Sequence, residues 1–527
     1  MAKKLTGLRA GSAALITATL VSTGAAAPAL AQEATGPKNI IFMIGDGMGY
    51  GHIALNNLFE TGQSKYTVEG PFAAEGAKEL EGKPVQAFED FERLSMSTFP
   101  KGGSYDPQKA WATHEYVTEG KITDSAAAGT ALATGMKTKN GVVGKSDYGH
   151  AEENISERAK AHGKAAGVVT SVPFSDATPA TFAAHNMDRN DHHAIAKEML
   201  NSDLDLVMGG GHPLYDNDNQ KLATPAYDYI SEEDFAALQA GNTDWTFFDS
   251  NDDFKALAEG NVKEDTKYWG LPQVGSTLQT GRAGESTVAF EDPMNDVVDL
   301  ATMTTGALNV LGQDEDGFSV MIEGGAIDWN GHGNNAARDI EEIQDFNKSV
   351  EAAIAWVEKN SSWDETLLIV TADHETGYLS GADEPAQGQW NAMAGKEDEL
   401  AKHGWYSGNH TNQLVPFFYK GAGSADIESK VVGTDPVRGE YIDNVTVADL
   451  VKTQWWIGSE DDDSEGSNES GNNSSEGSSL AENSVAAGFT GAGITAALIG
   501  LVVAAAQALG VLKIDMGALN KLIERML

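Results

Sequence analysis

The strongest constraint on the fold is a set of five short apolar runs, most of which end at or near glycine, an acidic residue or histidine. They occupy residues 38–44, 166–171, 204–208, 318–322 and 367–371. Continuous apolar runs of this length are typical of strands buried on both faces of a parallel sheet. Helical patterns lie between them, at 154–162, 295–311 and 336–359. This alternation predicts an α/β three-layer sandwich, with a large, mostly parallel central sheet and helices on both faces.

Polar side chains follow the apolar runs. Asp46, Asp176 and Glu323 come after three of the runs, and Asp373 and His374 come after a fourth. Ligands of open α/β sheets bind beyond the carboxyl ends of the strands. The sequence therefore predicts a site rich in carboxylates and histidines at that edge of the sheet.

The chain divides into a principal domain, residues 32–457, and segments at both ends. Residues 1–31 resemble an export signal, since Lys3 and Lys4 precede an apolar stretch and a small-x-small cleavage pattern ends at Ala31. We therefore expect an exported protein. Within the principal domain, residues 212–290 lack clear periodicity and are predicted to be a surface insertion.

The C-terminal end changes composition twice. Residues 458–484 are rich in Ser, Gly, Asn and acidic residues, which predicts a disordered linker. Residues 485–512 carry no charge and, as a helix of about 1.5 Å per residue, would exceed a bilayer core of roughly 30 Å. With basic residues in the tail 513–527, this segment is predicted to tether the protein to the cell membrane or envelope. The alternative is an oligomerising or envelope-associated helix that does not span.

The charge balance limits the class of partner. The chain has 36 Lys and Arg against 78 Asp and Glu, a formal net charge of −42. Coulomb repulsion then opposes nucleic-acid binding, and an anionic substrate would need local positive charge such as metal ions. Solubility in a salty medium also explains the acidity. There is no cysteine, so any zinc must be held by His, Asp and Glu.

A run of small residues from Thr123 to Gly135 contains the candidate nucleophile. Ser125 is expected at the N-terminus of a helix, where free N–H groups and the helix dipole favour a phosphate. On capping preference alone, Asp124 or Ser125 serving as a simple helix cap is the favoured reading. The decision depends on whether other residues fit the same chemistry.

Four further segments supply candidate metal ligands. Asp328 and His332 are four residues apart, so one helical turn places them on the same face. Singly, such residues are common outside metal sites, but together they suit zinc and magnesium. The candidates in these segments are Asp46, Glu323, Asp328, His332, Asp373, His374 and His410.

These residues closely resemble those of the alkaline phosphatase family. The resemblance runs from Asn39 to about Lys420 and is carried by Thr123–Ala127, Glu323–His332 and Thr371–His374, with Asp176–Ala180 and Arg189 in matching order. It implies a zinc- and magnesium-dependent enzyme that hydrolyses phosphate monoesters through a phosphoseryl intermediate.

The resemblance also implies roles for individual residues. Ser125 matches the nucleophile, Arg189 the arginine that holds two phosphate oxygens, and Asp124 a residue that orients Arg189. The implied metal ligands are Asp328, His332 and His410 for one Zn²⁺, Asp46, Asp373 and His374 for the second, and Asp46, Thr178 and Glu323 for Mg²⁺, with Asp176 near the magnesium.

Some features depart from the family pattern. Trp329 stands where the enteric members carry lysine, and Gly331 replaces an acidic residue. Homodimers are common in the family, so a homodimer is a further expectation. The alternatives are a related metal hydrolase acting on phosphodiesters or sulfate esters, and a non-catalytic surface protein that binds metal or phosphate.

Overall fold

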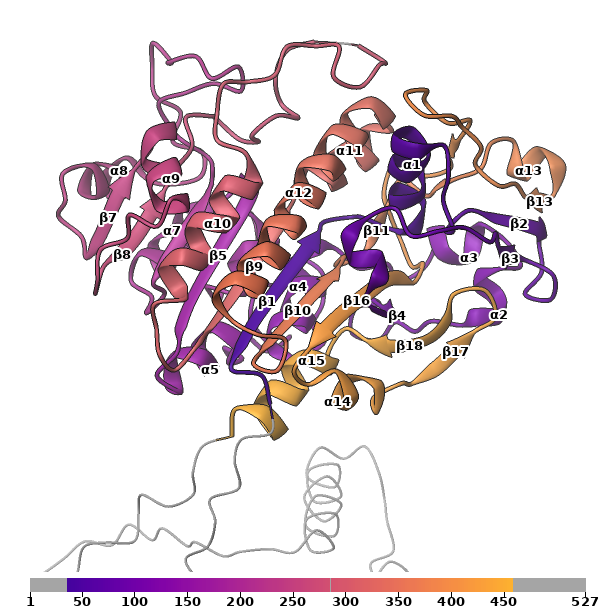
Figure 1. Cartoon of the computed structure of the whole chain (residues 1–527), viewed down its shortest axis with the longest axis horizontal. Coiled ribbons are helices and arrows are strands. Elements are labelled where there is room, and N and C mark those ends of the chain that lie inside the picture. The colour runs from indigo at the N-terminus through magenta and orange to yellow at the C-terminus, as the bar shows by residue number, and fades with distance from the viewer. Residues whose placement is uncertain (1–35, 285, 458–527) are drawn as a thin grey trace, which may run out of the picture. The chain divides into compact units, whose positions relative to one another are not determined.

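The computed structural model describes residues 36–284 and 286–457. The central feature of this part of the chain is a mixed sheet of 11 strands (Figure 1). Every neighbouring pair from β10 to β7 is parallel, whereas β16 is antiparallel to both β10 and β4. In spatial order the strands are β17 (Gly433–Asp435), β18 (Gly439–Asp443), β4 (Glu92–Ser97), β16 (Val415–Gly421), β10 (Thr366–Thr371), β1 (Asn39–Gly45), β9 (Phe318–Gly324), β5 (Ala165–Pro173), β6 (Leu206–Gly210), β8 (Lys267–Gly270) and β7 (Trp245–Phe248).

Helices cover the sheet. Those packed in front of it in Figure 1 include α10 and α12, while α4 lies behind it and packs against α5 and α6. The prediction of an α/β sandwich with a mostly parallel sheet is confirmed. The helices are α1 (Tyr50–Thr61), α2 (Pro107–Ala110), α3 (Glu115–Thr118), α4 (Ser125–Thr134), α5 (Ile155–Ala161), α6 (Ala177–Thr181), α7 (His192–Leu200), α8 (Glu232–Gln239), α9 (Asn251–Ala258), α10 (Leu300–Leu311), α11 (Ala326–Gly333), α12 (Ala336–Asn360), α13 (Glu384–Gln387), α14 (Ser424–Glu428) and α15 (Thr446–Leu450).

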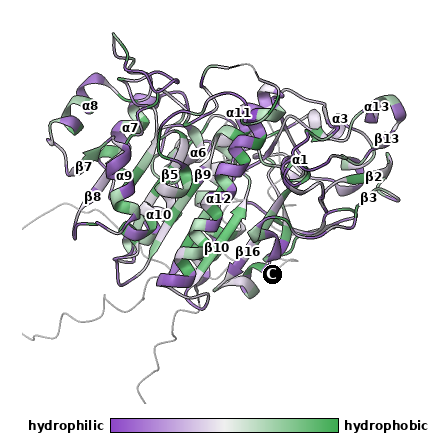
Figure 2. Ribbon diagram, turned by 45° about the horizontal axis from the view of Figure 1, so that its top comes forward, coloured by the Kyte–Doolittle hydropathy of each residue, from purple (hydrophilic) through white to green (hydrophobic). Residues whose placement is uncertain are grey.

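Helix α12 illustrates how the sequence produces this layer. Its buried Ile343, Phe346, Val350 and Val357 recur at helical spacing, so one face packs on the sheet. The Asn335 side chain accepts a hydrogen bond from the Arg338 N–H and caps the start of the helix. Figure 2 shows the same division, with strand β10 coloured as hydrophobic and α12 carrying both hydrophilic and hydrophobic residues along its length.

The strand register aligns the ends that carry the polar residues. Ile44 in β1 lies opposite Thr371 in β10 and opposite Glu323 in β9. Thr170 in β5 is also level with Glu323. Because parallel neighbours end at the same level, the loops that follow these strands emerge side by side at one edge.

Short strands outside the main sheet bring a later part of the chain to this edge. In particular, β11 pairs with β15, so Thr376 lies opposite His410. The remaining short strands build two small sheets beside the main one. Their bounds are β2 (Val68–Pro71), β3 (Lys78–Glu79), β11 (Glu375–Thr376), β12 (Leu379–Ser380), β13 (Gln389–Trp390), β14 (Gly404–Trp405) and β15 (His410–Thr411).

The prediction that residues 212–290 form a surface insertion is wrong for their central part. This range contributes β7 and β8 to the edge of the main sheet, together with α8 and α9. Each strand has only four residues, and the two middle residues of β7 are more exposed than its ends, as an edge strand allows. Such strands lack the continuous apolar run that identifies central strands.

The predictions made for the two ends of the chain lie outside the described residues. They concern the export signal at 1–31, the linker at 458–484, the apolar segment at 485–512 and the tail at 513–527. Within the described ranges, no helix is both long enough and apolar enough to span a bilayer.

The packing of β8 generates a test of the revised boundary. Trp269 is fully buried, and its ring contacts those of Phe174 and Trp245 at centroid distances of 5.0 and 5.1 Å. We expect Trp269→Ala to lower the free energy of unfolding by about 3–5 kcal/mol, the usual effect of removing a large buried aromatic side chain. Val288→Ala, at an exposed position in the same range, is the control. Equal urea midpoints for both variants would show that β8 is not part of the core.

Candidate active site

Ser125 is the first residue of α4, and its hydroxyl is not used as a helix cap. Asp124 performs that role, because its Oδ1 accepts a hydrogen bond of 2.9 Å from the Ala127 N–H. The helix ends at Gly135, whose φ of 70° is left-handed. The buried Ser125 hydroxyl is therefore free to face the carboxyl edge of the sheet, 3.2 Å from His374 Nε2. Of the two capping alternatives, Asp124 is the cap.

Arg189 lies between two acidic residues beside this serine. Its guanidinium donates to Asp124 Oδ2 at 3.3 Å and to Asp176 Oδ1 at 3.4 Å. Burial alone would lower the pKa of Arg189, but the negative charges of Asp176 and Asp124 have a larger, opposite effect. The pKa of Arg189 is therefore raised. The two carboxylates thus hold a permanently charged, planar fork in place, a geometry suited to two oxygens of one phosphate.

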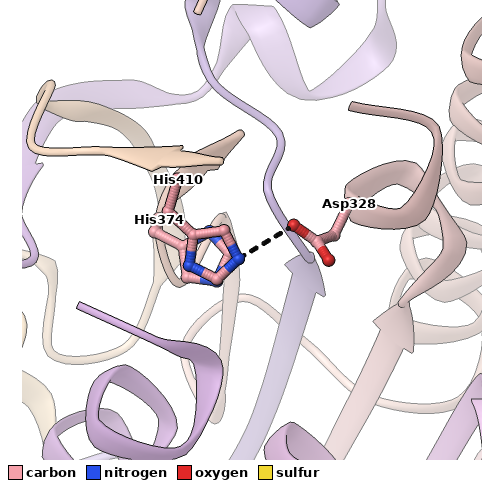
Figure 3. Close-up of side chains that lie close together, drawn as sticks. All are labelled: Asp328, His374 and His410. Carbon is pink, nitrogen blue, oxygen red and sulfur yellow. Dashed lines mark ion pairs between the residues drawn. The ribbon is translucent and has the colours of Figure 1, made fainter. Parts of the chain in front are cut away.

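One group of candidate ligands comes from α11 and β15. Asp328 Oδ2 lies 3.5 Å from His332 Nε2, and Asp328 Oδ1 lies 3.3 Å from His410 Nε2. The expectation that Asp328 and His332 share one helical face is confirmed. Figure 3 shows the Asp328 carboxylate pointing at the His410 ring, with His374 stacked on that ring at a centroid distance of 3.6 Å.

The two histidines of this group face each other through their Nε2 atoms, 3.1 Å apart. His332 Nδ1 lies 2.8 Å from the Gly408 carbonyl, and His410 Nδ1 lies 2.9 Å from the Thr123 carbonyl. A carbonyl only accepts hydrogen bonds, so each neutral ring carries its proton on Nδ1 and directs an Nε2 lone pair into the site. Two converging lone pairs are the arrangement that a metal ion requires.

The second group lies at the ends of β1 and β10. His374 Nε2 is 3.4 Å from Asp46 Oδ1 and 3.1 Å from Asp373 Oδ2. Both of these carboxylate oxygens are buried without a hydrogen-bond partner among the described residues. Buried polar atoms are almost always partnered, so these two oxygens fit a bound cation. The donor atoms of Asp46, Asp373 and His374 lie within 4.8 Å of one another, as do those of Asp328, His374 and His410.

Oxygen donors gather beside the second group. Thr178 Oγ1 donates to Asp46 Oδ2 at 3.3 Å, and Thr170 donates to the Glu323 carboxylate. Burial raises the pKa of Glu323 to about 8, although its hydrogen bond from Thr170 opposes the shift. The Asp176 carboxylate accepts hydrogen bonds from the first N–H of α6 and from Arg189. Carboxylate and hydroxyl oxygens without nitrogen suit Mg²⁺.

The pKa values of the site carboxylates are shifted because these groups are buried and lie close to one another. Burial and then the charge of Asp373 raise the pKa of Asp46 well above its ordinary value. Burial would also raise the pKa of Asp328, but His410, when its ring is protonated on both nitrogens, lowers it on balance through a hydrogen bond and its charge. Like charges at this spacing cannot all remain ionised without compensation, and a bound cation supplies that compensation.

The site contains residues that the sequence analysis did not identify. Thr170 binds Glu323, and the Thr376 hydroxyl contacts both Asp328 and His374. Thr376 follows His374 by two residues, but a threonine in a short strand carries no functional signal by itself. Trp329, one of the departures from the family pattern, is half-buried on α11. A side chain at Gly331 would meet Thr376 Cγ2 at 2.9 Å, which accounts for glycine there.

Known proteins are similar to this chain in sequence. The family model for alkaline phosphatase matches residues 37–403. Alkaline phosphatase 3 of Bacillus subtilis (strain 168) is 30% identical over 353 residues, which cover 66% of this chain and 63% of that protein. Alkaline phosphatase of Escherichia coli (strain K12) is 27% identical over 392 residues, covering 68% of this chain and 75% of the relative. The match to the Bacillus protein thus spans less than two thirds of its length.

A solved structure resembles the described fold as well. The alkaline phosphatase from the Antarctic bacterium TAB5 aligns with a TM-score of 0.54 and 26% identity, over 80% of this chain and 99% of that structure. The family match over most of the chain and the shared fold lead to one conclusion: the chain belongs to the alkaline phosphatase family.

Proposed function

We propose that this chain hydrolyses phosphate monoesters to an alcohol and inorganic phosphate, through a covalent phosphoseryl intermediate on Ser125. One observation carries the proposal. The Ser125 hydroxyl, freed from capping by Asp124, lies 3.2 Å from His374, beside two groups of converging metal-ligand atoms. A non-catalytic metal-binding protein would have no need of a hydroxyl so placed.

The proposed metal complement is two Zn²⁺ and one Mg²⁺. Asp328, His332 and His410 would hold the first zinc, and Asp46, Asp373 and His374 the second; Asp46, Thr178 and Glu323, with Asp176 near them, would hold the magnesium. The paired nitrogens and the two unpartnered carboxylate oxygens support this division. When bound, the ions supply positive charge that lowers the pKa of a hydroxyl and stabilises the oxygen of the leaving group.

In the first step, the Ser125 oxygen attacks phosphorus in line with the departing alcohol oxygen. The Ser125 hydroxyl loses its proton, a bond from Ser125 Oγ to phosphorus forms, and the ester P–O bond breaks. The departing oxygen takes up a proton and leaves as the alcohol. Arg189 holds two non-bridging oxygens, and the N-terminus of α4 adds its dipole. Asp124 and Asp176 keep the guanidinium from rotating away.

In the second step, water attacks the phosphoseryl group from the vacated side. The bond between phosphorus and Ser125 Oγ breaks, the serine regains its proton, and inorganic phosphate departs. Two in-line displacements retain the configuration at phosphorus. Arg189 contacts the same oxygens in both steps, so it favours the charged transition states of each.

We further propose that the enzyme is exported and tethered at its C-terminus, and that it forms a homodimer. Export is supported by the signal-like residues 1–31 and tethering by the uncharged stretch 485–512, both read from the sequence. The homodimer is supported only by its frequency in the family.

The role of Ser125 is tested by substitution. Ser125→Ala should abolish labelling by a radioactive phosphate monoester in acid-quenched protein and lower kcat by several orders of magnitude, because no other hydroxyl occupies its place. Ser156→Ala, at a buried serine in the first turn of α5, should label normally. Phosphate still attached to Ser125→Ala would sink the assignment.

Metal removal is the second test. Dialysis against a chelator should abolish hydrolysis of a nitrophenyl phosphate monoester and lower the midpoint of thermal unfolding, because the buried carboxylates then repel one another. Zn²⁺ with Mg²⁺ should restore both. A metal-free protein with full activity would contradict the proposal.

Arg189→Lys is the third test. Lysine keeps the charge but loses the fork, so kcat/KM should fall by about 10–100-fold, corresponding to one or two charge-assisted hydrogen bonds. Arg158→Lys, at a partly exposed ion pair with Glu153, should leave steady-state kinetics unchanged. Identical kcat/KM values for Arg189→Lys and the unmodified enzyme would exclude a bidentate phosphate contact.

A further inference from the structure

Thr376 touches the segments that carry three of the candidate ligands. This residue of β11 is fully buried. Its hydroxyl lies 2.5 Å from Asp328 Oδ1 and 3.2 Å from His374 Nδ1, which belong to different ligand groups. Its backbone N–H donates at 3.0 Å to the carbonyl of Gly47, the neighbour of Asp46. One side chain therefore connects the two groups directly.

The direction of these hydrogen bonds follows from the number of protons available. A hydroxyl has one proton, and the ionised Asp328 carboxylate only accepts, so Thr376 donates to Asp328. The Thr376 oxygen must then accept from His374 Nδ1–H. This fixes the neutral His374 ring with its lone pair on Nε2, the atom that faces Asp46, Asp373 and Ser125.

A buried pair of side chains holds Thr376 from behind. His52 Nε2 in α1 lies 2.8 Å from the Thr376 carbonyl, and His52 Nδ1 lies 3.0 and 3.1 Å from the two carboxylate oxygens of Asp339 in α12. Both side chains are wholly buried. Burial lowers the pKa of His52, but Asp339 raises it more, to about 10 on balance. The charged ring donates from both nitrogens and ties β11 to two helices.

Close packing leaves Thr376 little room to move. A Cβ at Gly47, whose φ is +71°, would lie 2.8 Å from Thr376 Oγ1. A Cβ at Gly331, in the helix that carries Asp328, would lie 2.9 Å from Thr376 Cγ2. Glycine at both positions lets the backbones of two ligand-bearing segments approach this one side chain.

We propose that Thr376, held by the His52–Asp339 pair, is a positioning residue that couples the two zinc-ligand groups. It sets the Nδ1–H tautomer of His374 and the orientation of the Asp328 carboxylate together. The inference rests on the proposed zinc site. Hydrogen-bond partners of metal ligands typically contribute about 10–100-fold to metal affinity or activity.

The test compares Thr376→Ser with Thr376→Ala in the full chain. Both variants lose the methyl group, and only serine keeps the hydroxyl. Metal-free protein is titrated with Zn²⁺ against a chromophoric chelator, which gives stoichiometry and affinity without reference to catalysis. We expect Thr376→Ala to bind Zn²⁺ about 10–100-fold more weakly than Thr376→Ser, and Thr376→Ser to approach the unmodified protein. His52→Gln should weaken Zn²⁺ binding in the same direction, because it loosens the Thr376 carbonyl.

A matched control separates positioning from general destabilisation. His212→Gln removes another buried histidine paired with an aspartate, Asp249 at 3.2 Å, without any hydrogen bond to a candidate ligand. It should leave Zn²⁺ affinity unchanged. If Thr376→Ala is unfolded by circular dichroism, Thr376→Val takes its place, since valine keeps the shape.

The results of these titrations separate the role of Thr376 from the existence of the zinc site. Equal Zn²⁺ affinities for the hydroxyl-free variant and Thr376→Ser would overturn the role of Thr376. Failure of the unmodified protein to bind two Zn²⁺ ions would instead overturn the proposed metal site on which that role rests.

Discussion

Burial of several carboxylates at one edge of the sheet is the constraint on which the rest of the site depends. Asp46, Glu323, Asp328 and Asp373 are all buried, and the nearby guanidinium of Arg189 is paired with Asp124. Charges removed from water at short range repel strongly unless they are compensated. Two things can compensate for the repulsion. Some carboxylates can be protonated, as the raised pKa values of Asp46 and Glu323 indicate, or cations can bind among them. The folded state therefore contains repulsion between buried carboxylates, which bound metal ions would relieve.

The central strands could be predicted from the sequence because their signal is local. Each is a continuous apolar run, and the runs at 38–44, 318–322 and 367–371 correspond to neighbours β1, β9 and β10. The edge strand β7 and its neighbour β8 could not be predicted in this way. They have four residues each, and their place in the sheet depends on packing of Trp269 against rings from other elements, which no local pattern reports.

The candidate site also contains residues that the sequence predicted and residues that it did not. Asp46 was predicted because it follows a strand, and the end of a strand implies a position at the edge of the sheet. Ser125 was predicted as the nucleophile only because other residues, and the resemblance to the family, fit the same chemistry. Only the structure shows that Asp124, and not Ser125, caps the helix, since both residue types cap helices. The supports behind the ligands were missed altogether. His52 meets Asp339 and Thr376 across 287 and 324 residues of sequence, and hydrogen bonds over such separations leave no spacing to detect.

The most direct measurement of the central claim is anomalous X-ray diffraction at the zinc absorption edge from crystals grown with Zn²⁺, Mg²⁺ and phosphate. The account predicts two zinc peaks, one among Asp328, His332 and His410 and one among Asp46, Asp373 and His374, with phosphate contacting Arg189 and lying next to Ser125. Zinc peaks elsewhere, or phosphate bound away from Ser125 and Arg189, would contradict it.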